Sequence, residues 1–159
     1  DIYQGLRIDL SRDYGTKFVI FHELLNDNYV LPYKGASFHF LSTFYIPREM
    51  WESKPWPYAV YVTNSFFGNF GEANLYGWGL TTSVLMELIS NTGWFGLIIF
   101  PVFYVWAIKK LEKTSSLVVQ GMGILILVLL LVIHAVAILY LIFLFFLLLF
   151  FSKYRVTFK

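Results

Sequence analysis

The sequence predicts an all-α, polytopic membrane protein, with three transmembrane helices in its carboxyl half and a large, mostly helical extracytoplasmic loop in its amino half. Two gaps in the charge pattern support this prediction. No Asp, Glu, Lys or Arg occurs over residues 88–108 or 114–152, and each gap reaches the roughly 20 residues that a helix needs to cross a bilayer. Only 14% of the residues are charged, whereas soluble domains average about 25%. A soluble fold of this length could hardly cover such apolar tracts.

Residues 1–84 form the predicted extracytoplasmic loop, which is large enough to need a structure of its own. Apolar residues at helical spacing predict one or two amphipathic helices over 4–25. A short amphipathic stretch over 36–45, rich in Phe and Tyr, suits a membrane interface. Three prolines make 46–57 largely non-helical, because each one restricts the backbone. Four glycines among aromatic residues predict a loop over 68–79.

The carboxyl half is expected to cross the membrane three times, over about 85–108, 116–132 and 136–152. As a single helix, the tract 116–152 would measure about 55 Å, which is nearly twice the thickness of the hydrocarbon core. Two crossings with a turn near 134–137 fit that thickness better. Because no Gly or Pro marks the turn, one long kinked helix stays open as the alternative.

Basic residues after the crossings set the expected orientation. Lys109, Lys110 and Lys113 follow the first crossing, and Lys153, Arg155 and Lys159 follow the last. Cytoplasmic flanks collect Lys and Arg, and both clusters lie on that side if the intervening tract crosses twice. Residues 1–84 then face the periplasm or exterior. Because the chain begins at Asp1 in the middle of a pattern, we expect a carboxyl-terminal piece of a longer protein with further membrane helices.

Composition excludes several kinds of site. The chain has no cysteine, which excludes disulfides, thiol catalysis and zinc–thiolate centres. The sequence contains no strong basic patch of the kind that binds nucleic acid, no convincing spacing of metal ligands, and no phosphate-cradling or dinucleotide motif. We therefore expect no metal, no cofactor and no nucleic-acid partner.

The most informative stretch is a proline-rigidified loop that carries Arg48, Trp51 and Lys54. A guanidinium binds phosphate oxygens in a bidentate manner, and a lysine adds a compact positive charge. The flat face of Trp51 suits stacking on a sugar ring. Together they indicate an anion and sugar site at a membrane surface. The alternative is a solvated loop in which Arg48 pairs with Glu49 or Glu52 and Trp51 anchors the interface.

A second group of charges lies in the first predicted helix. Asp9 and Arg12 are neighbours at i, i+3 spacing, and Arg7 lies further round the helix. Two arginines that face a cavity would clamp a diphosphate. The alternative is an ordinary surface pair of Asp9 with Arg12.

Glu87 and the histidines are the remaining candidates for acid–base chemistry. Glu87 stands at the outer end of a predicted membrane helix, where an ionisable group is a functional candidate; the alternative is an acid favoured there by the helix dipole. His22 and His39 lie on apolar-flanked segments, where each is either a general base or structural. His134 falls at the predicted outer turn and is expected to face water.

These residues occur in an order that resembles bacterial oligosaccharide repeat-unit polymerases, the O-antigen or Wzy-type polymerases. The resemblance spans about residues 5–110, and its most specific part is the Pro-Arg-x-x-Trp-x-x-Lys-Pro element. The quoted elements are Arg7-Ile8-Asp9, Gly35-Ala36-Ser37, Pro47-Arg48-Glu49-Met50-Trp51-Glu52-Ser53-Lys54-Pro55, Glu87, and Asn91-Thr92-Gly93-Trp94-Phe95-Gly96. Some members of the wider group carry Arg-x10-Gly loops, which this sequence lacks, so an arginine-loop mechanism does not transfer.

The resemblance implies an enzyme that joins undecaprenyl-diphosphate-linked oligosaccharides into O-antigen, capsular or exopolysaccharide at the outer face of the bacterial cytoplasmic membrane. It also implies a metal-independent, GT-C-like, all-helical fold with its active site in external loops. The partners it implies are the lipid-linked diphosphate, membrane lipid and a chain-length regulator. The expected diphosphate ligands are Arg7, Arg48 and Lys54, with Arg12 a weaker one. Asp9, Glu87 and His39 are candidates for the base, and Trp51 and Trp56 for sugar stacking.

Two other functions stay open. An O-antigen ligase uses the same donor with a different acceptor, and the sequence barely separates it from a polymerase. A transporter or membrane scaffold is the non-enzymatic alternative. A transporter should show polar or broken helices at mid-membrane, whereas the last two predicted crossings are nearly pure Leu, Ile, Val and Phe. Those crossings are therefore interpreted as lipid-facing supports.

Overall fold

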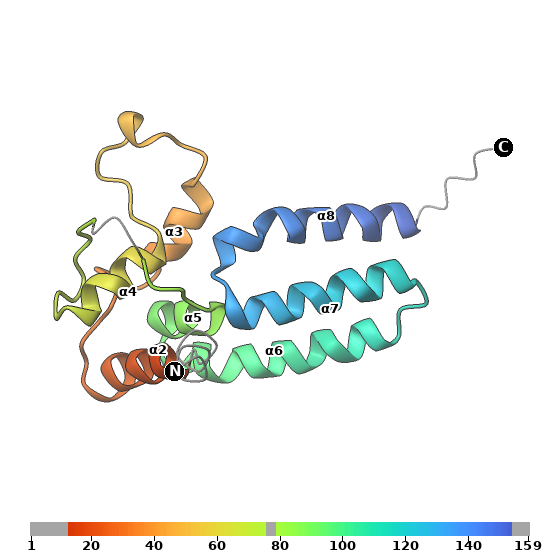
Figure 1. Ribbon diagram of the computed structural model, residues 1–159, viewed down its shortest axis with the longest axis horizontal. Helices are drawn as coiled ribbons and strands as arrows, with labels where there is room; N and C mark the ends of the chain where they lie inside the picture. The colour runs from red at the N-terminus through yellow and green to blue at the C-terminus, as the bar shows by residue number, and fades with distance from the viewer. Residues whose placement is uncertain (1–12, 76–78, 154–159) are drawn as a thin grey trace, which may run out of the picture.

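The computed structural model describes residues 13–75 and 79–153 and is all-helical over them, as the sequence predicts. The chain divides into a head of short helices and a bundle of long helices that lie side by side (Figure 1). We use "head" for the described residues from 13 to 92 and "bundle" for the helices that follow. Arg7, Asp9 and Arg12 lie outside the described residues, so their predicted roles stay predictions.

The short elements of the head follow the punctuation of the sequence. They are α2 (Asp13–Ile20), which continues as a π-helical turn over Phe21–Leu25, then α3 (Ala36–Thr43), a 3-10 turn at Arg48–Met50, α4 (Tyr58–Phe66) and α5 (Val84–Thr92). Helix α4 begins directly after Pro57, and the Ser83 side chain caps α5 by accepting from the Met86 N–H. The predicted helix over 36–45, the largely non-helical stretch 46–57 and the described part of the loop 68–79 are confirmed.

The core of the head forms where α2, α4 and α5 meet. Val19 of α2, Val62 of α4, and Met86 and Ile89 of α5 are almost completely buried in one hydrophobic cluster. Residues of the connecting segments, such as Val30, complete it. The core therefore fixes α5 inside the head.

The prediction of one apolar helix over 85–108 is wrong, because the helix ends at Thr92 and a new one begins at Trp94. Gly93 makes the break with φ = 63°, a left-handed conformation that favours glycine. A Cβ on Gly96 would lie 2.5 Å from the Leu88 carbonyl oxygen. Gly96 therefore permits the close packing of α6 against the end of α5. Hydropathy does not distinguish a helix covered by protein from one covered by lipid, so it does not predict the break between α5 and α6.

The bundle consists of α6 (Trp94–Glu112), α7 (Leu117–Val132) and α8 (Ala135–Lys153), which run alternately away from and back to the head (Figure 1). Helices α7 and α8 form a hairpin whose turn, at Ile133 and His134, has extended backbone at Ile133. The prediction of two helices is therefore confirmed over one long kinked helix. Among the described residues, α6 alone is long and apolar enough to span a membrane, while α7 and the apolar part of α8 are shorter.

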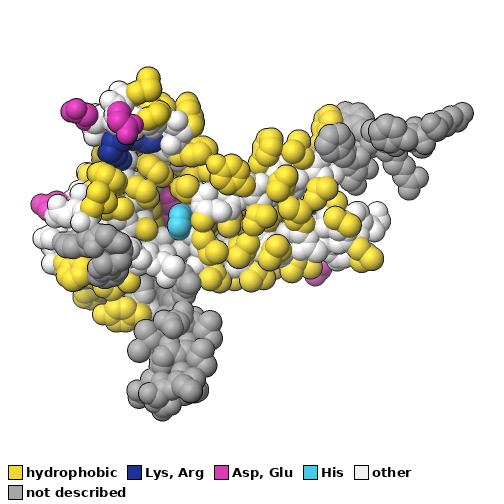
Figure 2. Space-filling view, turned by 45° about the horizontal axis from the view of Figure 1, so that its top comes forward, with side chains coloured by type: hydrophobic (Ala, Val, Ile, Leu, Met, Phe, Trp, Pro, Cys, Tyr) yellow, Lys and Arg dark blue, Asp and Glu magenta, His cyan; other side chains and the backbone are white. Residues whose placement is uncertain are grey.

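The surface of the bundle is mostly hydrophobic. Phe95, Val102 and Tyr140 are 72%, 67% and 73% exposed, and apolar side chains cover the visible face of the bundle in Figure 2. A helix that is apolar on all sides belongs either in a protein core or in a membrane. Little of α6 is buried among the described residues, so its apolar surface is open to a covering lipid or protein.

Candidate functional site

A buried polar site lies where the head meets the bundle. Its centre is Glu87 of α5, whose side chain is only 2% exposed. Helix α5 begins after its Ser83 cap, about one turn before Glu87. Glu87 and Asn91 are four residues apart in this helix and therefore share a face. The Asn91 Nδ2 donates to the Ser37 Oγ of α3 and to the Glu87 carbonyl oxygen, both at 2.6 Å. Ala135, the first residue of α8, interacts with the Glu87 carboxyl through its backbone N–H.

Two acceptor atoms at this junction lack a donor. Among the described residues, neither the Glu87 Oε2 nor the Asn91 Oδ1 has a hydrogen-bond partner, although both atoms are buried. Buried polar atoms are nearly always paired, so each exception calls for an explanation. A bound hydroxyl or water, or a proton on Glu87 itself, would supply the missing donor. We call Glu87, Asn91 and Ser37 the junction site.

Burial sets the protonation behaviour of Glu87. It raises the pKa of the carboxyl above the ordinary value of 4.5, and the Ser37 hydroxyl and the Ala135 N–H oppose that shift only in part. Loss of hydration penalises the charged form of an acid, whereas donors that point at it favour that form. The first turn of α8 adds the positive end of a helix dipole. Glu87 is thus an acid poised to accept a proton, held between three helices.

A second polar network lies against the neighbouring face of α5, at Met86 and Ser90. The Tyr58 hydroxyl of α4 donates to the Met86 carbonyl at 3.0 Å and lies 2.7 Å from the Ser90 Oγ. Desolvation by burial holds the pKa of Tyr58 well above 10.0, helped by the negative charges of Glu87 and Glu23. Tyr58 therefore stays neutral and serves as a hydrogen-bond donor.

Glu23 and Lys34 complete this second network. The Glu23 carboxylate accepts from the Val30 N–H at 2.8 Å and forms an ion pair with Lys34. The Lys34 Nζ also donates to the Ser90 carbonyl at 3.1 Å and lies over the Tyr29 ring. The Lys34 side chain is 43% exposed, while that of Glu23 is fully covered. Lys34 thus places a cation between the surface and the helix that carries the junction site.

The predicted cations Arg48 and Lys54 bind their own loop. Lys54 is only 6% exposed, and its Nζ donates to the Phe44 and Ile46 carbonyls at 3.1 and 2.7 Å. The Arg48 guanidinium donates to the Lys54 and Pro55 carbonyls at 2.7 and 2.9 Å. Among the described residues, the hydrogen bonds of the Arg48 guanidinium are with backbone oxygens. The alternative, in which Arg48 pairs with the Glu49 or Glu52 carboxylate, is therefore not what holds Arg48 in place.

Aromatic side chains surround the same loop. The Arg48 guanidinium lies 3.6 Å from the centre of the Trp56 ring, an arrangement in which the cation is attracted to the π face. The Trp51 ring lies 5.2 Å from the exposed His39 ring, and the Trp51 Nε1 donates to Ser53. The Tyr33 hydroxyl is 2.9 Å from the His39 Nδ1. His39 and Trp51 therefore share an exposed surface, while Trp56 is engaged by Arg48.

The predicted site residues that the structure describes thus fall into two groups. Arg48, Trp51, Lys54 and Trp56 share one loop with His39 beside it, whereas Glu87 lies in the junction site. Helix α3 separates the groups, because it carries His39 on its exposed face and Ser37 on its buried one. The structure does not bring a Lys54 or Arg48 donor to the Glu87 carboxyl in any described contact.

Sequence reasoning did not single out Glu23, Lys34, Tyr58 or Ser90 as site residues. Glu23 and Lys34 are 11 positions apart, and a long-range pair of this kind leaves no periodic signal. Tyr58 is one aromatic residue among many. His22, which was weighed as a base, packs against Phe18, Phe21 and Phe70, which favours the structural alternative. The family resemblance did mark Ser37 and Asn91, and these two contact each other.

Comparison with protein-family models, with curated proteins and with solved structures finds no significant match to this chain.

Proposed function

We propose that this protein is a metal-independent glycosyltransferase that polymerises undecaprenyl-diphosphate-linked oligosaccharide repeat units at the outer face of the bacterial cytoplasmic membrane. The ordered motifs that resemble oligosaccharide repeat-unit polymerases suggest the reaction. The observation that carries the proposal is the junction site, which holds a buried acid with an unpaired oxygen at the membrane end of the head.

The membrane topology in this proposal has α6, α7 and α8 each crossing the bilayer. Helix α6 ends at Glu112, next to Lys109, Lys110 and Lys113, and α8 ends at the same end of the bundle, away from the head (Figure 1). Lysines gather on the cytoplasmic side of membrane proteins, so the head faces outward. The 16 residues of α7 give a helix of about 24 Å, which a modest local thinning of the bilayer accommodates.

Glu87 acts as the general base in the proposed reaction. Its Oε2 accepts the proton of an acceptor-sugar hydroxyl, while the Asn91 Oδ1 accepts from a neighbouring hydroxyl. The acceptor oxygen forms a bond to the anomeric carbon of the donor as the bond from that carbon to the diphosphate oxygen breaks. The raised pKa matches this role, because a base works best when its pKa approaches the ambient pH. Since Glu87 is 2% exposed, the acceptor enters when α3 or the α7–α8 turn moves aside.

The departing lipid diphosphate needs cations. Lys34 is the cation with a described contact to the helix of the junction site, through the Ser90 carbonyl. Arg48 keeps N–H donors beyond those that it directs at its loop and is only half-buried. Lys54 would have to give up a carbonyl to bind phosphate with more than one N–H. We propose that Lys34 and Arg48, with Arg7 and Arg12, neutralise the diphosphate, and that Lys54 mainly shapes the loop.

The test is polymerisation by the purified protein in bilayers, with a lipid-linked repeat unit as sole substrate. Glu87→Gln keeps the size of the side chain and removes the base, so chain growth should fall about 100-fold or more. Glu72→Gln, at an exposed carboxylate of the head, is the matched control and should keep its rate. Thermal unfolding of both variants checks the fold.

Full polymer formation by a folded Glu87→Gln protein would overturn the role of Glu87. The competing activity has a separate signature in cells. If deletion leaves a polymer ladder on the lipid carrier but removes it from the lipopolysaccharide core, the protein is a ligase. If deletion removes the ladder itself, the protein is a polymerase.

A further inference from the structure

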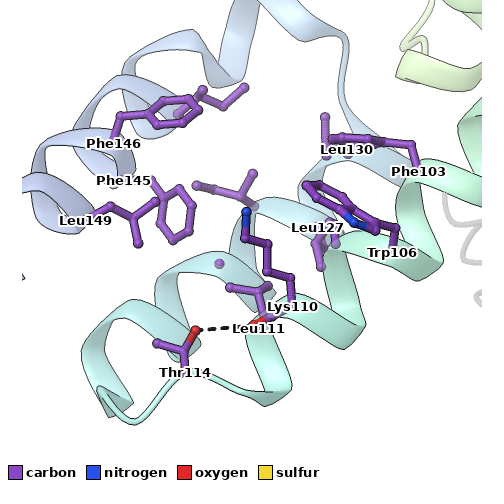
Figure 3. A pocket seen from close by; sticks show the side chains of 14 residues that line it. Phe103, Trp106, Lys110, Leu111, Thr114, Leu127, Leu130, Phe145, Phe146 and Leu149 are labelled. Atoms are coloured by element: carbon purple, nitrogen blue, oxygen red, sulfur yellow. Dashed lines mark hydrogen bonds between the residues drawn. The ribbon is translucent and has the colours of Figure 1, made fainter. Parts of the chain in front are cut away.

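The bundle contains an apolar groove at the end away from the head. It lies between α6, α7 and α8, because α8 packs on α7 and makes few contacts with α6. Its volume is about 470 Å³, within the range of about 300–1,000 Å³ for small-molecule sites. Trp106 and Phe103 of α6 line one wall, Leu127 of α7 the floor, and Phe145 and Phe146 of α8 the other wall (Figure 3).

Lys110 is the one charged residue among the described residues that line this groove. Figure 3 shows its side chain extending into the space between α6 and α8. Its Nζ lies 4.9 Å from the centre of the Trp106 ring. Thr114, whose hydroxyl donates to the Lys110 carbonyl at 3.4 Å, closes the groove toward the end of α6. A lysine has an apolar stem and a charged ammonium group. It therefore suits a ligand whose apolar part fills the groove and whose anionic group lies at the groove's mouth.

We infer that this groove binds one acyl chain of an anionic membrane phospholipid, with the lipid phosphate on Lys110. From Lys110 to Phe103 the groove follows about 10 Å of helix, enough for the upper part of an acyl chain. Basic pockets between membrane helices on the cytoplasmic side recognise anionic headgroups, and Lys109 and Lys113 add positive charge at the same level. The inference rests on the membrane topology proposed above and is independent of the role of Glu87.

The groove suits a lipid better than a second copy of this chain. A protein helix seated in the groove would have to bring an acidic side chain to Lys110 along with apolar side chains that fill the uncharged lining. A phospholipid supplies the anion and the apolar chain together. The single cation at the mouth and the uncharged lining therefore match one amphiphile with a negative headgroup.

Quenching of Trp106 by brominated lipid tests the inference in the intact protein. The protein is placed in phosphatidylcholine bilayers, and phosphatidylglycerol with brominated chains is titrated in, with brominated phosphatidylcholine as the parallel series. The Trp106 signal is the difference between the protein and its Trp106→Phe variant. Phosphatidylglycerol should quench Trp106 at lower membrane content than phosphatidylcholine.

Lys110→Gln should raise the phosphatidylglycerol content needed for half-quenching about fivefold, the effect expected for one juxtamembrane lysine. Lys109→Gln removes the same charge outside the groove lining and should leave the curve close to that of the unmodified protein. Ala107→Phe fills the groove and should remove the difference between the two lipids. Polymerisation by these variants is measured separately, so failure here is distinct from failure of the enzymatic proposal.

Three results would overturn the inference. Equal quenching by the two lipids means that the groove does not select an anion. Equal effects of Lys109→Gln and Lys110→Gln mean that the attraction is a diffuse surface effect. No quenching of Trp106 by either lipid means that protein, from another part of the polypeptide or a second copy, covers the groove.

Discussion

The head buries polar side chains beside its apolar core, whereas the bundle exposes large apolar side chains. Inside the head, Glu23, Asn64, Glu87 and Ser90 are at most 4% exposed, and most of their polar atoms have hydrogen-bond partners. In the bundle, large apolar residues such as Phe95 are mostly exposed. A buried polar group destabilises the fold unless it is paired, so the head needs a defined geometry. The exposed surface of the bundle is mainly apolar and carries few groups that could do chemistry, so the candidate site is sought in the head.

The joint between the two regions should be the most sensitive position. Gly96→Ala places a Cβ 2.5 Å from the Leu88 carbonyl oxygen and 2.7 Å from the Thr92 hydroxyl oxygen. Since Leu88 presents backbone there, relief requires α5 and α6 to separate, and we expect a loss of about 3 kcal/mol in stability. Thermal unfolding in detergent measures the loss.

Gly121→Ala is the matched control for Gly96→Ala. Gly121 is also helical, but a Cβ there meets nothing within 4 Å. This variant should keep its stability or gain a few tenths of a kcal/mol from helix propensity. Equal unfolding temperatures for the two variants would show that the head does not pack on α6 as described.

Lys54 provides the next largest test, and it separates a loop scaffold from a phosphate ligand. Lys54→Met keeps the apolar stem and removes the donors to the Phe44 and Ile46 carbonyls, so we expect a loss of about 2 kcal/mol. Faster hydrogen exchange over 44–55 should accompany it. Lys113→Met, at an exposed lysine of the α6–α7 connection, should change neither property. Unchanged stability combined with lost polymerisation would instead favour the originally predicted phosphate contact.

Glu87 should show a smaller, pH-dependent effect whose sign follows from its burial. Because the folded-state pKa is raised above 4.5, the folded protein holds a proton that the unfolded chain releases as pH rises. The stability due to this group is therefore complete below the unfolded pKa and falls as pH rises through the folded pKa. Unfolding free energies against pH for the unmodified protein and for Glu87→Gln should diverge in that window, with the variant more stable at the upper end. Parallel curves would contradict the raised pKa.

The sequence predicts the elements of this fold better than their surroundings. The uncharged tract and its length predict α7 and α8 nearly to the residue, with the turn displaced to Ile133 and His134. The break at Gly93 escapes prediction, because local hydropathy does not reveal that the rest of the head covers α5. The charge of Lys54 suggested a free cation, whereas folding directs it at carbonyls of a segment that only the tertiary structure brings close.

The sequence predicts the central residue of the candidate site but not the residues that surround it. The placement of Glu87 at the end of an apolar tract marks it as an unusual acid, and the structure buries it. Its neighbours Ser37 and Ala135 come from positions 50 residues before and 48 residues after it, so only packing assembles them. The Glu23–Lys34 pair depends on packing in the same way, because the π-helical turn that carries Glu23 has no sequence signature of its own.

In the proposed topology, the head lies on the external side of the membrane and the lysine end of the bundle lies on the cytoplasmic side. The chain has no cysteine, so one introduced cysteine reports its own position. Met50→Cys stands in the head at a residue that is 80% exposed, and Ser115→Cys stands at an exposed residue between α6 and α7. In spheroplasts, a membrane-impermeant maleimide should label Met50→Cys directly and Ser115→Cys only after permeabilisation. Labelling in the reverse order, or of both sites from outside, would contradict the claim.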